Sequence, residues 1–278
     1  AMEPSYLRRM VSSIRSGLWV ADAPPPEESE APTTEVTADG LALISISGPM
    51  VQGYSKFCQA DTMRARREIR GAVRDTEIGG ILLVIDSPGG MLAGTQELAD
   101  DIAAAAERKA THAHIDDLGA SAGYWAASQA GYITANRTAE VGSIGVYAVV
   151  EDLSEAADLQ GVKVHVISTG PNKGAFVPGS EVTEDQLAVL QESVEEAHGH
   201  FRAAIAGGRG LTDAQLDTVS DGRTWGAEAA MELGLVDEVA NLDGAVDSLR
   251  AEVDRRSRLD RARRNMRAAQ VRGRLNGA

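Results

Sequence analysis

The sequence predicts an α/β fold in which repeated βα units build a mostly parallel sheet and a helical part follows toward the C-terminus. Two features support this prediction. The run Gly80–Asp86 is apolar up to its last residue, which is typical of a strand covered on both faces. The segments between such runs place their apolar residues at helical spacing. Alternating strands and helices favour parallel strands joined by right-handed crossovers.

The individual elements follow from apolar periodicity and from turn residues. The run Leu41–Ser47, for example, ends at Gly48-Pro49, which marks a turn. Cap residues such as Thr183 and Thr212 precede the later helices. Strands are expected at Leu41–Ser47, Gly80–Asp86, Thr111–Asp116, Tyr132–Ala135, Ile144–Val149 and Val162–Ile167. Helices are expected at Ala60–Asp75, Leu92–Glu107, Ser121–Gln129, Glu151–Gln160, Thr183–Ala206, Asp213–Val219 and Ala227–Leu233.

Length and composition indicate one principal domain with loose ends. The chain has 278 residues, of which 43% are hydrophobic, enough for one good core. Residues 1–39 form an N-terminal segment, and its part Ala21–Asp39 is rich in proline and glutamate, so we expect disorder there. Residues 40–250 form the domain and residues 251–278 a basic tail. No apolar run approaches the roughly 20 residues of a membrane span, so none is expected.

The charge of the chain is acidic and unevenly distributed. A net charge of −14 and a pI near 4.8 argue against a general nucleic-acid binder. Nine arginines nevertheless lie between Arg255 and Arg274, against the single acid Asp260. Such a tail fits an acidic partner, an anionic lipid surface or a nucleic acid, or is only a solvated helix. The single cysteine, Cys58, cannot form an internal disulfide, so we expect a cytoplasmic protein.

Ser121 is the candidate nucleophile. It lies between small residues in Gly119–Gly123, where a substrate carbonyl and backbone N–H donors have access to its hydroxyl. This loop and Asp86–Gly90 both follow predicted strands, and such loops carry the chemistry of α/β folds. We expect the amides of Gly90 and Ala122 to hold a tetrahedral oxyanion. The chemistry indicated is acyl transfer, with peptide hydrolysis as the favoured reaction.

Lys173 is the candidate general base. Arginine stays protonated at any working pH, and the only lysines are Lys56, Lys109, Lys163 and Lys173. A lysine serves as a base when burial lowers its pKa toward about 7–8. Lys163 alternates with valines on a predicted strand and Lys109 begins another, whereas Lys173 lies in a loop built from glycine and proline. Lys56 remains a rival base.

The Gly-x-Ser-x-Gly pattern alone leaves other interpretations open. It is equally typical of a helix start packed against a sheet. It also matches the nucleophile elbow of α/β-hydrolases, which requires a downstream histidine. His165, His198 and His200 are available, but the first alternates within a strand and the other two lie in a helical stretch. His198 and His200 lack an obvious third ligand, so no metal or other cofactor is expected. His112 and His114 share one strand face, which favours packing.

Six stretches of the chain carry a more specific pattern, and the last two are nearly continuous in sequence. They are Ile85–Gly90, Gly119–Trp125, Val141–Val146, Ser168–Lys173, Asp221–Ala230 and Leu233–Glu238. In this order they resemble the serine–lysine peptidases typified by bacterial signal peptide peptidase A and by the capsid-maturation proteases of tailed phages. That family has the ClpP/crotonase fold, and the resemblance covers the chain from about Leu41 to Leu249.

The resemblance implies roles for individual residues. Ser121 would be the nucleophile, Lys173 the general base, and Gly90 and Ala122 the oxyanion donors. Ser143 would be the hydroxyl that orients the lysine amine, although a serine in this glycine-rich stretch is equally typical of a turn. The stretch after Lys173 is more apolar than the family leads us to expect, which bears on the substrate pocket.

The resemblance also implies partners. We expect a peptide or protein substrate, with cleavage after small or apolar residues, and a homo-oligomer with active sites at or near subunit interfaces. The leading hypothesis is a serine endopeptidase that processes capsid and scaffold proteins in a phage or prophage head. One alternative is a soluble or de-anchored signal peptide peptidase that degrades membrane-derived peptides. Another is a non-catalytic assembly protein with the same fold.

Overall fold

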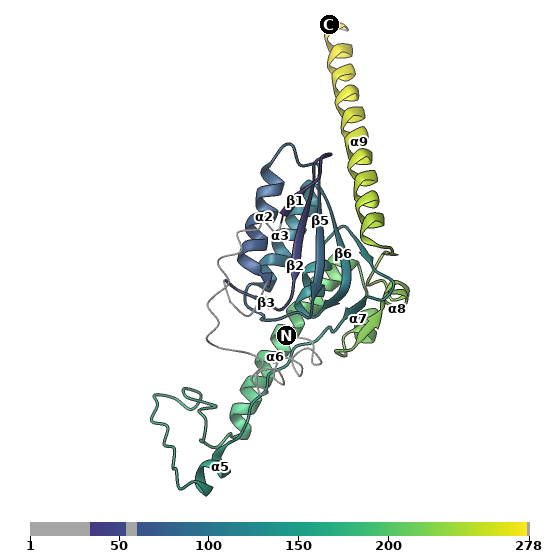
Figure 1. The fold of residues 1–278 in the computed structure, drawn as a ribbon. Helices are drawn as coiled ribbons and strands as arrows, with labels where there is room; N and C mark the ends of the chain where they lie inside the picture. Colours follow the sequence, from purple (N-terminus) through teal and green to yellow (C-terminus); the bar gives the residue numbers. More distant parts are fainter. Residues whose placement is uncertain (1–33, 54–59, 277–278) are drawn as a thin grey trace. The chain divides into compact units, whose positions relative to one another are not determined.

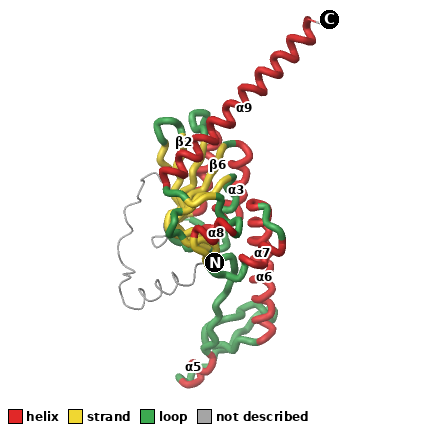
Figure 2. The backbone as a smooth tube through the Cα atoms, turned by 90° about the vertical axis from the view of Figure 1, so that its right-hand side faces the viewer, coloured by secondary structure: helices red, strands yellow, loops and turns green. Residues whose placement is uncertain are grey.

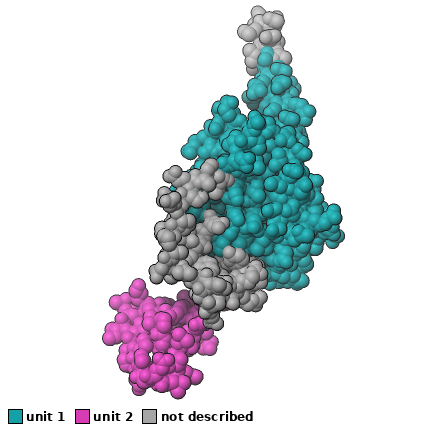
Figure 3. Space-filling view, in the orientation of Figure 1, with its two compact units in different colours: residues 1–144, 202–278 teal, residues 145–201 magenta. Residues whose placement is uncertain are grey.

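The structure, a computed structural model, describes residues 34–53 and 60–276. The segment before Thr34, the rival base Lys56 and the single cysteine Cys58 lie outside the described residues. The chain divides into two compact units, residues 1–144 with 202–278, and residues 145–201 (Figure 3). The first unit holds the sheet, and the second contains no strand.

A mostly parallel sheet forms the centre of the first unit (Figure 1). Its strands follow the order β1-β2-β5-β6-β7-β10, and β8 pairs with β6 and β9. All of these pairs are parallel except β1 with β2 and β8 with β9, and β3 and β4 form a separate parallel pair. The strands are β1 Thr34–Val36, β2 Leu41–Ser47, β3 Met50–Val51, β4 Ala60–Asp61, β5 Gly80–Ser87, β6 Ala110–Ala120, β7 Tyr132–Ala135, β8 Glu140–Gly142, β9 Thr224–Gly226 and β10 Glu238–Val239.

Helices cover both faces of this sheet (Figures 1 and 2). On one face α2 packs against β2 and α3, while α3 and α4 pack against β6. On the other face α9 packs against β5 and β6. The helices are α2 Thr62–Arg74, α3 Thr95–Arg108, α4 Ala122–Ala127, α5 Ser154–Leu159, α6 Glu184–Arg209, α7 Asp213–Val219, α8 Ala227–Glu232 and α9 Leu242–Asn276.

The alternation of side chains along the strands creates these two layers. Leu41, Leu82 and Ala110 are neighbours on adjacent strands and form one buried cluster with Ala245 and Leu249 of α9. The intervening strand residues face α2 and α3, because successive side chains point to opposite faces. Both faces of the central strands are therefore buried, as the continuous apolar runs predict. The predicted α/β fold class, with its parallel sheet and helical C-terminal part, is confirmed.

Two predicted strands are wrong. Residues 144–149 and 162–167 form no strand. Alternating apolar residues favour an extended chain, but a strand also needs a neighbour to pair with. The pairing of β8 ends at Gly142, and Ser143 has a φ of 50°, which turns the chain out of the sheet. Conversely, Thr34–Val36, in the segment predicted to be disordered, pairs with β2 as an antiparallel edge strand.

The second unit consists of irregular chain, the short helix α5 and most of α6. Only Ala197 and Phe201 are buried among its residues. Its large apolar side chains are instead mostly exposed: Tyr147, Val149, Leu153, Leu159, Val162, Val166, Ile167, Val177, Leu187 and Val189. A unit with so little buried apolar surface derives little stability from its own core.

Candidate active site

Ser121 lies at the junction of β6 and α4, in the first unit. It is the N-cap residue of α4 and only 1% exposed. Its φ of 53° and ψ of −122° are unusual for a residue with a side chain. The Ser121 N–H donates to the Gly142 carbonyl at 2.8 Å, and the Ser121 carbonyl accepts from the Trp125 N–H at 2.9 Å. These contacts hold the predicted nucleophile in a strained turn, a feature that clusters at functional sites.

Gly123 lets this turn lie against the loop that follows β5. A Cβ atom at position 123 would lie 3.1 Å from both the Cβ and the carbonyl oxygen of Ser87. The Ser87 hydroxyl is itself fixed, because it donates to the Gly48 carbonyl at 2.7 Å and accepts from the Gly89 N–H at 3.2 Å. Glycine at position 123 is thus explained by close approach of two backbones. The two loops singled out in the sequence meet at this point.

Gly90 is enclosed by β3. A Cβ atom at position 90 would lie 2.0 Å from the Met50 carbonyl oxygen. The Met50 N–H donates to the Gly89 carbonyl at 2.8 Å, and the Met91 N–H donates to the Met50 carbonyl at 2.9 Å. These bonds form a parallel bridge between Met50 and Gly90. They fix the direction of the backbone at the predicted oxyanion donor.

Ser143 follows β8 and lies beside the Ser121 turn. β8 pairs with the end of β6, where Ala120 is opposite Gly142. Ser143 is 6% exposed, and its N–H donates to the Arg223 carbonyl at 2.8 Å. Its φ of 50° is positive, like that of Ser121. The two serines therefore occupy matching strained positions at the ends of neighbouring strands.

Lys173 belongs to the second unit. It lies in a series of turns in which its N–H donates to the Gly170 carbonyl at 3.1 Å. Gly174 and Phe176 follow with φ values of 87° and 65°. The Lys173 residue is exposed in the single copy. The structure thus gathers Ser121, Ala122, Ser143 and the Gly90 loop in the first unit, whereas the predicted base lies in the other unit.

The other lysines have different environments. The Lys109 ammonium donates to three backbone carbonyls, those of Ala72 at 2.8 Å, Asp75 at 2.5 Å and Ile78 at 2.6 Å. Burial lowers its pKa. All three acceptors lie at or after the C-terminal end of α2, so Lys109 has a structural role. Lys163 is exposed, as the sequence predicts.

The histidines of β6 are packed within the first unit. His112 lies 5.2 Å from the Tyr132 ring, between centroids, and burial lowers its pKa to about 4. His114 is fully buried, its Nδ1 lies 2.8 Å from the Thr134 hydroxyl, and burial lowers its pKa too. Both rings are therefore neutral at pH 7. The packing role predicted for them is confirmed.

Sequence reasoning missed the polar network behind α4. The buried Arg209 guanidinium forms a bidentate pair with the Asp237 carboxylate at 2.8 and 2.9 Å. Asp237 also accepts from the Ile133 N–H at 2.7 Å. The fully buried Tyr124 hydroxyl, on α4, donates to the Leu235 carbonyl at 2.9 Å. The motif Gly-Leu-Val-Asp at positions 234–237 holds these acceptors, and this motif is the signal that would have found the network.

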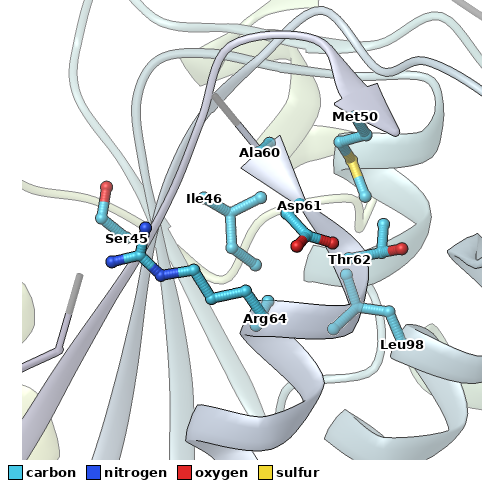
Figure 4. A pocket seen from close by; sticks show the side chains of 9 residues that line it. Ser45, Ile46, Met50, Ala60, Asp61, Thr62, Arg64 and Leu98 are labelled. Carbon is cyan, nitrogen blue, oxygen red and sulfur yellow. The ribbon is translucent and has the colours of Figure 1, made fainter. Parts of the chain in front are cut away.

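A small pocket lies under β3 and β4, near the Gly90 loop (Figure 4). Its apolar wall includes Ile46, Met50 and Leu98, and the Thr62 hydroxyl has no hydrogen-bond partner among the described residues. The cavity volume of about 10 Å³ is enough for about one water molecule. This volume is too small for a peptide side chain.

The comparison with known families identifies the family of the chain. The model of Peptidase family S49 matches residues 103–256, more than half of the chain. The matched stretch contains Ser121, Ser143 and Lys173. The chain belongs to peptidase family S49. Within the described residues of this S49 chain, no helix is long and apolar enough to span a membrane.

Three similar proteins, one from a phage and two from bacteria, carry protease names. Capsid assembly protease C of Escherichia phage lambda is 32% identical over 233 residues, which cover 81% of this chain and 52% of the phage protein. Protease 4 of Salmonella typhi is 29% identical over 211 residues, with coverages of 76% and 34%. A putative signal peptide peptidase SppA of Enterococcus faecium is 28% identical over 186 residues, with coverages of 66% and 54%. The chain spans about half of the phage protein and a third of protease 4.

Proposed function

We propose that this S49 peptidase hydrolyses peptide bonds with Ser121 as nucleophile and Lys173 as general base. The observation that carries the proposal is the strained turn at Ser121, where β6, α4 and the loop after β5 meet. A buried serine held at an unfavourable φ by several independent contacts needs a functional reason. Attack on a peptide carbonyl supplies one.

The proposed reaction has two halves. The Ser121 hydroxyl oxygen attacks the scissile carbonyl while a neutral Lys173 amine takes the hydroxyl proton, and the C–N bond then breaks as the lysine returns that proton to the leaving amine. Water, deprotonated by the same lysine, next cleaves the acyl-serine ester. The Gly90 and Ala122 N–H groups stabilise the oxyanion in both halves, each contributing about 3–4 kcal/mol to the transition state in comparable hydrolases. Ser143 would orient the lysine amine.

Assembly of several copies completes this mechanism. Lys173 is exposed in one copy, yet a neutral amine needs surroundings that exclude water. The second unit carries Lys173 and many exposed apolar side chains, which indicates that further chain covers it. We therefore propose a homo-oligomer in which the active site lies at or near a subunit interface.

Three variants test the dyad. Ser121→Ala and Lys173→Ala should each lower the rate of casein cleavage by about a thousandfold or more. Lys163→Ala is the matched control, since Lys163 is an exposed lysine of the same unit, and it should cleave at the wild-type rate. Wild-type cleavage by Lys173→Ala would refute the assignment of the base. If the intact protein cleaves nothing, the non-catalytic assembly role gains support.

A mixing experiment tests whether the dyad is shared between copies. If Lys173 of one copy serves Ser121 of another, mixed particles of Ser121→Ala and Lys173→Ala recover activity, because some sites receive both intact groups. If each copy supplies both groups to its own site, the mixture stays inactive. Recovery that depends on co-assembly would support a dyad shared between copies, and no recovery from verified mixed particles would contradict a shared dyad.

The proposed biological role is the processing of capsid and scaffold proteins in a phage or prophage head. Similarity to the phage capsid assembly protease supports it. Similarity to protease 4 and SppA supports a second candidate, the degradation of signal peptides. Incubation with purified phage coat and scaffold proteins separates the two: specific cleavage of those proteins supports the first role. Cleavage of signal-type peptides alone supports the second.

A further inference from the structure

Residues 257–268 of α9 form an exposed stretch of helix with an unexplained surface. Ala245 and Leu249 of α9 are buried against the sheet, whereas every residue from 257 to 268 is exposed. In Figures 1 and 2 this part of the helix continues beyond the edge of the sheet that α9 covers. Most helical stability in proteins comes from the packing of one helix face, which raises the question of what this stretch binds.

The positive charge on this helix is mostly not neutralised. Its ion pairs are local: Arg255 and Arg256 pair with Glu252, and Arg263 lies 4.0 Å from Asp260. Four further arginines form no ion pair within the described part of the chain: Arg258, Arg261, Arg264 and Arg267. The helix therefore presents concentrated charge of one sign on a chain whose net charge is −14.

An apolar stripe runs along one face of this stretch, with Arg258 on one side of it and Arg263 on the other. Leu259, Ala262 and Met266 follow one another at intervals of three and four residues, so they share one face of α9. Leu259 is 46% exposed and Met266 is 61% exposed. Binding to the phosphate backbone of a nucleic acid would not bury such a stripe. Two large apolar side chains are also too few to hold a helix at a bilayer surface. An amphipathic helix of this kind suits an apolar groove with an acidic rim.

The second unit of this chain has such a groove. It lies between α6 and the segment 146–150, has a volume of about 610 Å³, and is lined by Val146, Val150, Leu187, Leu190 and Val194 among others. Glu184 also lines it, and Glu195 lies on α6 eleven residues further along. Residues 145–201 contain ten acidic residues against two lysines. Groove and helix are thus complementary in both polarity and charge.

We propose that the exposed part of α9 from one copy docks into the groove of residues 145–201 in a second copy. Leu259 and Met266 enter the apolar groove, and Arg258 and Arg263, which flank the stripe, pair with Glu184 and Glu195 at its rim. This contact joins unlike surfaces, so it can link successive copies around a ring or along a chain. It does not depend on the proposed chemistry, because neither Ser121 nor Lys173 takes part.

Sedimentation velocity over a range of concentrations tests the contact. The combined variant Arg258→Glu and Arg263→Glu should weaken self-association about tenfold or more at 50 mM salt, and high salt should also weaken self-association of the wild type. The matched control reverses two exposed arginines outside the tail, Arg67→Glu and Arg137→Glu, and should associate like the wild type. Circular dichroism checks that each variant keeps its helix content.

A charge swap makes the test specific. Glu184→Arg with Glu195→Arg should also weaken association, and mixing this groove variant with the tail variant should restore it. The proposal is wrong if tail reversal leaves association unchanged, or if mixing restores nothing while each variant alone dissociates. It is equally wrong if the wild type stays monomeric but binds a DNA duplex or anionic phosphatidylserine vesicles through the same arginines, since another partner then occupies the helix.

Discussion

At the scale of single residues, backbone strain marks the candidate site. Among the described residues, only Ser121, Ser143 and Phe176 have positive φ without being glycine. Two of them are predicted site residues and the third lies three positions after Lys173. Such conformations cost about 1–3 kcal/mol each and persist only where the surroundings impose them. The strain was not predictable from the sequence, because Gly-x-Ser-x-Gly specifies small residues but not the φ of the serine.

Asp86 gives a residue-scale prediction about pH. Burial raises the pKa of this carboxyl, and Asp117 and Asp116 raise it further. The pKa of Asp86 is therefore higher in the folded state than in the unfolded state, where it is about 3.9. Once the pH rises above that unfolded-state pKa, ionisation of Asp86 destabilises the folded protein. Asp86→Asn should therefore stabilise the protein against urea at pH 7 and have little effect near pH 3.

The control for this prediction is Asp158→Asn, because Asp158 is exposed in the second unit. It should leave the urea midpoint unchanged at both pH values. Equal stabilisation by Asp86→Asn at pH 3 and pH 7 would show that ionisation is not the cause.

At the scale of elements, a segment needs both an apolar pattern and a neighbouring strand to pair with before it forms a strand. The runs at 41–47, 80–86 and 132–135 became strands because each has a neighbour in the sheet. The alternating segments 144–149 and 162–167 have no such neighbour within their unit and remain irregular. Local sequence predicted the first group correctly since pattern and tertiary context agree there. Sequence could not reveal that strand pairing in this part of the chain stops at Gly142, where β8 ends.

Lys109 gives the element-scale prediction. Its ammonium joins the end of α3 to three carbonyls at and after the end of α2. Lys109→Met keeps the apolar stem but leaves these carbonyls without their donor, so the free energy of unfolding should fall by roughly 1–3 kcal/mol. Urea denaturation measures the loss. Lys163→Met, at an exposed position, should change it by less than about 0.5 kcal/mol, and an equal loss in both variants would contradict the capping role.

At the scale of the whole molecule, the two units differ in how much they bury. The first has a continuous core around the sheet, and the second buries only Ala197 and Phe201. The residues of the candidate site are divided in the same way, because Ser121 belongs to the first unit and Lys173 to the second. Sequence motifs located the Ser121 turn, the Gly90 loop and Ser143, which the first unit brings together through strand pairing. They could not reveal that Lys173 is exposed, because exposure depends on tertiary contacts and not on the local motif.

Hydrogen exchange gives the whole-molecule prediction. In dilute protein, amides of residues 145–183 should exchange fast, because few buried contacts protect them, while those of β5 and β6 exchange slowly. At high protein concentration the 145–201 unit should gain protection if copies cover it, and the β5 and β6 amides serve as the internal control. Protection of this unit that is the same at every concentration would contradict the need for a covering copy.

The central claim is that a neutral Lys173 activates Ser121. Fluorophosphonate labelling, followed by intact-mass measurement and peptide mapping between pH 5 and pH 9, tests it most directly. We predict a single adduct on Ser121, formed faster as the pH rises, slowed about a hundredfold or more in Lys173→Ala and unchanged in Lys163→Ala. An adduct on another residue, or equally fast labelling of Ser121 in Lys173→Ala, would contradict the claim.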